Sequence, residues 1–299
     1  MSAASDPAAA GGLPVLDVRD VTMQFGGLKA LSSFSLTLRP RELVGLIGPN
    51  GAGKTTAFNA ITGVYPPTSG DVFVLGERVN GKRPHQICMR GIARTFQNIR
   101  LFKELTALDN VRVALHHGRV AGFAGAFFLT PHFVRDEQRI TRAAEEFLAV
   151  MGLAPRRDEQ SKNLPYGEQR RLEIARALAS GPKLLCLDEP AAGMNASEKV
   201  ALMELIHKIR DQFGVAILVI EHDMRVVMGV SERMVVLDHG VTIAQGAPAD
   251  IRRNPKVIEA YLGDSYLEEK HIPVPVAGPL DAPPAVPPAV PPAVPMDET

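Results

Sequence analysis

Apolar and polar residues alternate through residues 15–43, most clearly in VLDVRDV and SLTLR. This period of two is typical of half-buried antiparallel strands. Three later segments are dominated by unbroken apolar runs, namely VGLIG at 44–48, LLCLD at 184–188 and AILVIEH at 216–222. Runs of this length predict strands that are buried on both faces of a parallel sheet.

Helical patterns lie between these runs. TTAFNAITG follows the first run, and SEKVALMELIHKIRDQFG precedes the third. Strands that alternate with helices predict an α/β core with a parallel sheet. Residues 98–165 contain no comparable buried strand and have mostly helical patterns, of which RAAEEFLAVMGL is the clearest. We therefore expect an inserted helical subdomain there.

The two ends of the chain differ from the middle in composition. Residues 1–14 are small and rich in Ala and Gly, and residues 265–299 contain three PPAV units. Such a proline-rich segment favours an extended conformation and cannot pack a core. We expect a disordered leader over 1–14, a folded domain over 15–264 and a disordered tail over 265–299.

Composition narrows the class of protein. The chain has 299 residues, of which 45% are hydrophobic, enough for one large core with a satellite subdomain. Lys and Arg total 33, as do Asp and Glu, so the charge balance gives no sign of a nucleic-acid partner.

The cysteines, the start of the chain and its apolar segments bear on the compartment. Cys88 and Cys186 lie far apart without metal-ligand spacing, which indicates a reducing compartment. The start lacks the pattern of a signal peptide. The apolar segment GFAGAFFL at 122–129 is too short to span a membrane.

The first buried run leads into GPNGAGKTT, which matches the phosphate-binding loop pattern G-x-x-x-x-G-K-[ST]. Its glycines let backbone N–H groups surround a phosphate, and the following helix directs its positive end at the same anion. Lys54 would reach the β- and γ-phosphates of a nucleotide, and the Thr55 hydroxyl would ligate Mg²⁺. The predicted nucleotide-binding residues of this loop are Gly48, Pro49, Asn50, Gly51, Ala52, Gly53, Lys54, Thr55 and Thr56.

The other two buried runs also end in residues with useful chemistry. Asp188 would hold Mg²⁺, through water, and Glu189 would act as the general base that polarises the attacking water. The alternative is that Asp-Glu-Pro is only a polar turn at the end of a strand. His222 follows the third run, where it would hydrogen-bond a γ-phosphate. Because parallel strands share one carboxyl edge, the three motifs are predicted to converge.

These motifs, in this order, resemble those of the ATP-binding subunit of an ABC transporter over residues 14–263. The match includes RTFQNIRLF with Gln97, and NLPYGEQRRLEIARAL at 163–178, which corresponds to the signature motif of that family. The resemblance implies an α/β P-loop NTPase fold with a parallel-sheet core, an antiparallel β subdomain and an inserted helical subdomain. It also implies ATP and Mg²⁺ as ligands, with two such subunits packed head to tail around two ATP molecules.

Several further roles follow from the resemblance. Gln97 would touch Mg²⁺ or the attacking water, and Phe25 would stack on adenine, although a strand-end core residue is the alternative for Phe25. The signature segment would contact the ATP of the second subunit through Leu164, Pro165, Tyr166, Gly167 and Glu168.

The signature also departs from the usual Leu-Ser-Gly-Gly-Gln. Pro165 replaces a serine hydroxyl, Tyr166 replaces a glycine, and Glu168 replaces a glutamine. Asn195 stands where the family usually has an aspartate. These changes concern the strength of the contact across the dimer and not the fold.

LxYGxQRRLEIAR, EPAAGxN, FGGLKAL, IEHDM and VIEAYLG together resemble one branch, the G-type ATPases of branched-chain (hydrophobic) amino-acid importers. That branch implies two membrane permease subunits, a sister ATPase, an indirectly associated solute-binding protein and a peripheral position on the cytoplasmic face of the inner membrane. The segment 122–129 belongs either to a subdomain core or to a surface for the permeases. One alternative function is the ATPase of a lipid or lipopolysaccharide exporter. Another is a soluble ABC protein acting on ribosomes or DNA.

Overall fold

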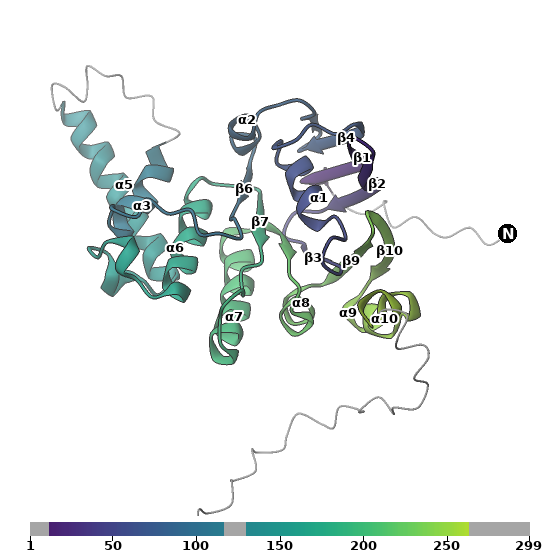
Figure 1. The fold of residues 1–299 in the computed structure, drawn as a ribbon. Coiled ribbons are helices and arrows are strands. Elements are labelled where there is room, and N and C mark those ends of the chain that lie inside the picture. Colours follow the sequence, from purple (N-terminus) through teal and green to yellow (C-terminus); the bar gives the residue numbers. More distant parts are fainter. Residues whose placement is uncertain (1–11, 117–129, 263–299) are drawn as a thin grey trace, which may run out of the picture.

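The computed structural model describes residues 12–116 and 130–262. Most of the predicted leader, the segment 122–129 and the predicted tail lie outside these residues. Two sheets organise the described part (Figure 1). One sheet is antiparallel, with the strand order β2-β1-β4-β5. Its strands are β1 (Leu16–Phe25), β2 (Leu28–Leu38), β4 (Ser69–Val74) and β5 (Glu77–Arg78).

The second sheet has six strands in the order β10-β9-β3-β8-β7-β6. All neighbours in it are parallel except β10, which pairs with β9 in the antiparallel sense. The strands are β3 (Leu43–Ile47), β6 (Ile92–Arg94), β7 (Leu184–Asp188), β8 (Ala216–Ile220), β9 (Arg233–Asp238) and β10 (Val241–Gly246). The three unbroken apolar runs thus form β3, β7 and β8, which are the predicted parallel strands.

These runs are apolar throughout because their two faces enter different cores. Along β8, Leu218 and Ile220 pack into the core shared with the antiparallel sheet, whereas Ile217 and Val219 pack into the core on the other face. All five residues of β3, of β7 and of β8 are buried. Two-sided burial of this kind requires the continuous hydrophobicity seen in the sequence.

Helices cover both faces of the six-stranded sheet. Helix α1 (Lys54–Ile61) lies between the two sheets and contributes Phe58 and Ile61 to the shared core. The other α-helices of the described residues are α2 (Pro84–Cys88), α3 (Ala107–Leu115), α5 (Pro131–Val150), α6 (Tyr166–Ala179), α7 (Ala196–Phe213), α8 (Met224–Val230), α9 (Pro248–Arg253) and α10 (Pro255–Leu262). Short 3₁₀ helices span Ala154–Arg156 and Ser161–Asn163.

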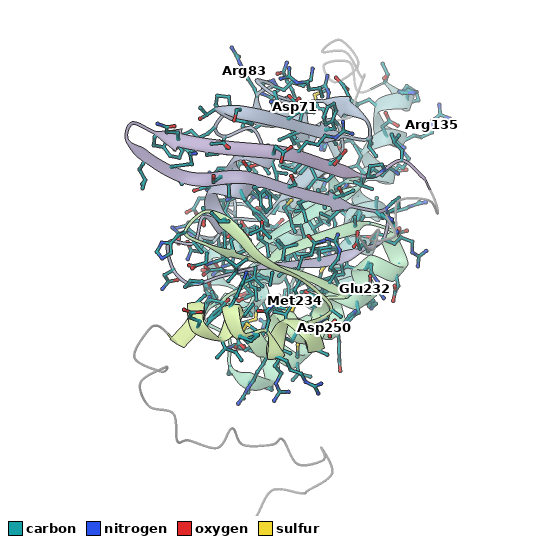
Figure 2. The ribbon with its side chains drawn as sticks, turned by 90° about the vertical axis from the view of Figure 1, so that its right-hand side faces the viewer. Asp71, Arg83, Arg135, Glu232, Met234 and Asp250 are labelled. Carbon is teal, nitrogen blue, oxygen red and sulfur yellow. The ribbon has the colours of Figure 1, made fainter. Side chains whose placement is uncertain are left out.

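Figure 2 views the molecule from the side of the antiparallel sheet. The strands β1 and β2 cross one half of this view, where Asp71 of β4 is labelled, and β10 with α9 lies in the other half, where Asp250 is labelled. Within residues 98–116 and 130–165 the described elements are helices, and Figure 1 shows α3 and α5 projecting away from the sheets. This arrangement has the parallel core, antiparallel subdomain and helical projection expected from the sequence.

Candidate nucleotide-binding site

The loop between β3 and α1 depends on glycine at two places. Gly48 has a φ of +153°, and a Cβ on it would lie 2.1 Å from the Leu237 carbonyl oxygen. Gly53 has a φ of +100°, and its Cβ would lie 2.6 Å from the Ala30 carbonyl oxygen. L-residues other than glycine rarely adopt such conformations, and here their side chains would also meet backbone. The tight loop GPNGAGKTT is therefore specified by its glycines.

Lys54 lies at the first position of α1 and is only 7% exposed. Its Nζ donates hydrogen bonds to the carbonyl oxygens of Gly48 at 2.7 Å and Pro49 at 2.8 Å. Burial lowers the pKa of Lys54, and the nearby carboxylates of Glu189 and Asp188 oppose that effect. The loop thus holds a cation in its centre, facing the carboxyl edge of the sheet. Thr55, which follows it, is exposed.

Asp188 ends β7 and is 4% exposed. Its Oδ2 accepts a hydrogen bond of 2.7 Å from Nη2 of Arg94, the last residue of β6. Nη1 of Arg94 donates to Asn59 of α1 at 2.8 Å. Arg94 is not among the site residues predicted from the sequence. Arg94 could have been recognised because it is a charged residue at the end of the apolar segment GIAR. A guanidinium group that is buried there needs an ion-pair partner.

Glu189 lies next to Asp188 with a left-handed backbone φ of +47°. Gln97 Nε2 donates to Glu189 Oε2 at 3.0 Å, and His222 Nδ1 lies 3.6 Å from the same oxygen. These three side chains come from the ends of β6, β7 and β8. The structure therefore brings together Gln97, Glu189 and His222 beside Asp188, as the sharing of one carboxyl edge predicts.

Glu221 is a second buried carboxyl group, and it is not among the site residues predicted from the sequence. Its Oε1 accepts a hydrogen bond of 2.7 Å from the Ala191 N–H, and its Oε2 accepts one of 3.2 Å from the His222 N–H. Glu221 is 1% exposed, and burial raises its pKa, against the opposing effect of these hydrogen bonds. It joins the loop after β7 to the loop after β8. The signal for it was the acidic residue directly after the apolar run AILVI.

Phe25 ends β1 and is 44% exposed. Its ring meets that of Tyr65 edge to face, with centroids 5.4 Å apart and an interplanar angle of 80°. The alternative interpretation of Phe25 as an ordinary core residue is wrong, because the ring is half exposed. An exposed aromatic ring offers a flat surface for a planar base. Stacking on adenine stays a prediction.

The signature segment begins α6. Leu164 is buried, Pro165 and Tyr166 are exposed, and Gly167 and Glu168 are half-buried. Pro165 is the N-cap residue of α6 and makes no side-chain capping bond. In the loop before α7, Asn195 instead caps its helix, because its side chain accepts from the Glu198 N–H at 2.9 Å. The start of α6 thus offers backbone N–H groups and the positive end of a helix.

The signature segment and the phosphate loop lie apart within one chain. In Figure 1, α6 and α1 are separated by β6 and β7. A cavity of about 450 Å³ includes Pro165, Gly167 and Glu168, and none of residues 48–56 lines it. The cavity beside the signature segment is thus separate from the phosphate loop within this chain.

The residues present fit a nucleotide that arrives with Mg²⁺. Glycines at the close backbone approaches, a buried lysine and the start of α1 suit a phosphate group. Among the described residues, no group of three His, Cys, Asp or Glu side chains could hold a metal alone. Mg²⁺ ordinarily keeps several waters and binds through one or two carboxylates and the phosphates of the substrate. Asp188 and Thr55 suit that mode.

Comparison with known proteins agrees with this geometry. The family model described as ABC transporter matches residues 31–192, and that described as branched-chain amino acid ATP-binding cassette transporter matches residues 241–266. The chain is 46% identical over 252 residues to the high-affinity branched-chain amino acid transport ATP-binding protein BraF of Pseudomonas aeruginosa. It has the same identity to LivG of Escherichia coli. Each alignment covers 84% of this chain and 99% of the relative.

A more distant relative is the lipopolysaccharide export system ATP-binding protein LptB of Escherichia coli, 32% identical over 85% of this chain and 99% of its own length. The crystal structure of the ADP conformation of MJ1267, an ATP-binding cassette of an ABC transporter, has a TM-score of 0.73 and 28% identity. That similarity covers 85% of this chain and 100% of MJ1267. On the family model, the long alignments and the shared fold, the chain belongs to the ABC transporter family and is an ABC ATPase.

Proposed function

We propose that this chain binds and hydrolyses ATP, with Mg²⁺, to power the import of branched-chain amino acids through a membrane transporter. The observation that carries the proposal is the meeting of Gln97, Glu189 and His222 at the carboxyl edge that also holds Lys54 and Asp188. The cargo is supported by the 46% identity to ATP-binding proteins of branched-chain amino-acid transport, against 32% to LptB. The exporter alternative has the weaker support.

In the proposed mechanism, Lys54 and the backbone of the phosphate loop bind the β- and γ-phosphates. Glu189 accepts a proton from the attacking water, and its carboxylate is oriented by the hydrogen bond from Gln97. His222, beside the same oxygen, would donate to the γ-phosphate. Bound Mg²⁺ supplies charge neutralisation of the phosphates, and Asp188 and Thr55 would hold it.

The proposed assembly follows from the incomplete site. Leu164 to Glu168 would complete the site of a second ATPase, either a sister subunit or a second copy, packed head to tail. Two permease subunits would span the membrane, and a solute-binding protein would deliver the cargo outside. In the described ranges, no helix combines the length and apolar character needed to cross a bilayer. As the ATPase of such a transporter, the chain would lie on the cytoplasmic face of the inner membrane, with its ATPase domain over residues 15–264 and its helical subdomain over 98–165.

The test is to extract the full-length protein from native membranes in mild detergent and identify the proteins that co-purify with it. The proposal expects two polytopic membrane proteins, a second ABC ATPase and ATP hydrolysis stimulated by a solute-binding protein loaded with leucine, isoleucine or valine. Permeases that associate with lipid or lipopolysaccharide would support the exporter alternative instead. Soluble partners or ribosomes alone would contradict the transport function and leave the ATPase site in place.

A further inference from the structure

We propose that Arg170 and Glu173 are positioning residues that hold Gln97 against Glu189 and make its position depend on the signature segment of the same chain. This inference rests on the proposed function. In that function Glu189 is the general base, and the signature segment contacts the nucleotide bound to a second subunit. Neither residue touches the loop that would bind phosphate. Both lie on α6, one helical turn apart.

Arg170 binds the backbone carbonyl groups on both sides of the Gln97 Cα. Its Nη1 donates to the Phe96 carbonyl oxygen at 2.6 Å, and its Nη2 donates to the Gln97 carbonyl oxygen at 2.7 Å. Two nitrogens of one planar guanidinium thus hold two consecutive carbonyl groups. Such a two-point contact fixes the direction of the chain as well as its distance from α6.

Glu173 holds the same segment through its N–H groups. Its Oε1 accepts hydrogen bonds from the N–H of Phe96 at 3.4 Å and of Arg100 at 3.2 Å. Its Oε2 accepts from Nη1 of Arg170 at 3.0 Å. The pair therefore offers donors and acceptors to one loop at once, so a displacement of the loop away from α6 would break these hydrogen bonds.

The burial of the pair makes the link stiff. Arg170 is 0% exposed and Glu173 is 2% exposed. A buried guanidinium and carboxylate must stay paired and hydrogen-bonded, because water cannot replace a lost partner. Separating α6 from the loop would therefore leave both charges buried without their hydrogen-bond partners, which favours movement of α6 and the loop together.

The link joins the signature segment to the base. Arg170 Nη2 also bonds the Tyr166 hydroxyl at 3.0 Å, and Tyr166 is the first residue of α6. At the other end, the Gln97 side chain donates to Glu189 at 3.0 Å. A shift of Tyr166 caused by the nucleotide of the second subunit would therefore displace Gln97 relative to Glu189. Each site would sense the occupancy of the other through its own chain.

A double-mutant cycle tests whether Glu173 acts through Gln97. The rate constant kcat for ATP hydrolysis is measured for the wild type, Glu173→Gln, Gln97→Ala and the double variant. Glutamine keeps the shape of Glu173 but removes its charge. We expect Glu173→Gln to lower kcat by about tenfold when Gln97 is present and by less than about twofold when Gln97 is Ala. The same loss in both backgrounds, or no loss in either, would overturn the proposal.

The matched control is Glu232→Gln, which removes an ion pair of 2.6 Å with Arg210. Glu232, labelled in Figure 2, directly precedes β9, whereas the loop follows β6, so the two lie at opposite edges of the parallel sheet. Its kcat should stay within about twofold of the wild type. The Kd of trinitrophenyl-ATP should be unchanged in Glu173→Gln, because Lys54 and its loop are intact. If Glu173→Gln does not fold, Tyr166→Phe replaces it in the double-mutant cycle with Gln97→Ala. Tyr166 is 45% exposed, so the loss of its hydroxyl should be tolerated by the fold. We expect Tyr166→Phe to lower kcat by about threefold when Gln97 is present and to leave kcat unchanged when Gln97 is replaced by Ala.

All variants are compared as the full chain in the complex extracted from membranes. If no membrane subunits co-purify, kcat is measured on the purified full chain. The double-mutant cycle can then still be interpreted even if the proposed transport function is wrong. Coupling between the sites also predicts a Hill coefficient for ATP above 1 in the wild-type dimer that falls toward 1 in Glu173→Gln. An unchanged Hill coefficient above 1 in that variant would contradict the link to the signature segment.

Discussion

Arg94 and Asp188 form an ion pair, with Nη2 of the arginine 2.7 Å from Oδ2 of the aspartate. Their side chains are only 8% and 5% exposed. The other guanidinium nitrogen, Nη1, reaches Asn59 and Thr62 of the segment that follows the phosphate loop. One arginine thus connects the ends of two strands with helix α1. The carboxylate expected to hold Mg²⁺ is already neutralised by a cation of the protein.

Replacing Arg94 by Gln should destabilise the fold strongly. The change leaves the Asp188 carboxylate buried without a charged partner, which costs about 3–5 kcal/mol in comparable cases. Urea unfolding would measure the loss. The matched control is Arg19→Gln, because Arg19 pairs with Asp17 at the surface with its side chain 63% exposed. That change should cost less than about 1 kcal/mol. Equal losses in the two variants would contradict the importance of the buried pair.

A methyl group on Gly48 should disrupt the phosphate loop more than one on Gly51. At Gly48 the added carbon would lie 2.1 Å from the Leu237 carbonyl oxygen and 2.9 Å from the Ala52 Cβ. At Gly51 nothing lies within 4 Å, although φ is +83°. Gly51→Ala should therefore cost only backbone strain, about 1–2 kcal/mol.

Gly48→Ala should cost more than that, because overpacking adds to strain. It should also abolish binding of trinitrophenyl-ATP, because the loop must open to relieve the clash. Fluorescence titration and urea unfolding would measure both effects. Tight nucleotide binding by Gly48→Ala would show that the loop has another geometry.

The parts of the fold that the sequence predicts are those set by local pattern. Ile217 and Val219 alternate with Leu218 and Ile220 between two cores, so their strand had to be apolar throughout. The phosphate loop is similarly local, because glycine positions and one lysine define it.

The contacts that could not be predicted from the sequence join segments that are far apart along the chain. Arg94 meets Asp188 across 94 positions, and Arg170 meets the Phe96 carbonyl across 74. In the sequence, Arg170 is one of three arginines near the start of a helix, and nothing local says that it is the buried one. Only the packing of α6 against the loop after β6 decides that. A charged residue within an apolar segment indicates a buried ion pair, but the sequence does not show which residue is its partner.

Glu221 predicts a pH dependence of stability. Burial raises its pKa above that of the unfolded chain, so its contribution to stability is fully present below the unfolded-state pKa and is lost as the pH rises through the folded-state pKa. Glu221→Gln removes this titration while the amide oxygen still accepts from the Ala191 N–H. The free energy of unfolding of Glu221→Gln minus that of the wild type should therefore increase as the pH rises above about 4, the unfolded-state pKa of a glutamate, through the folded-state pKa of Glu221.

The opposite sign is expected at Asp223 and serves as the control. A hydrogen bond from Lys199 Nζ at 2.7 Å is the main cause that lowers the pKa of Asp223. Its stabilising contribution is present above the unfolded-state pKa and is lost as the pH falls through the folded-state pKa. Unfolding of Asp223→Asn should therefore differ most from the wild type at neutral pH and least in acid. The same trend in both variants would contradict the environment assigned to Glu221.

Glu189→Gln should separate nucleotide binding from hydrolysis. The amide cannot accept the proton of the attacking water, and loss of a general base lowers rates by about 10²–10⁴-fold. The Kd for ATP should stay near that of the wild type, whereas Lys54→Ala should raise it. Single-turnover hydrolysis and equilibrium binding give the two quantities. Turnover of Glu189→Gln at the wild-type rate would remove Glu189 as the base.

Uptake of radiolabelled leucine by cells whose only copy of this protein carries Glu189→Gln shows whether ATP hydrolysis at this site powers import. We expect leucine uptake to fall to the level of cells lacking the protein, while lysine uptake is unchanged. Leucine uptake at the wild-type level, with the variant present in normal amount and inactive as an ATPase, would contradict the proposed function.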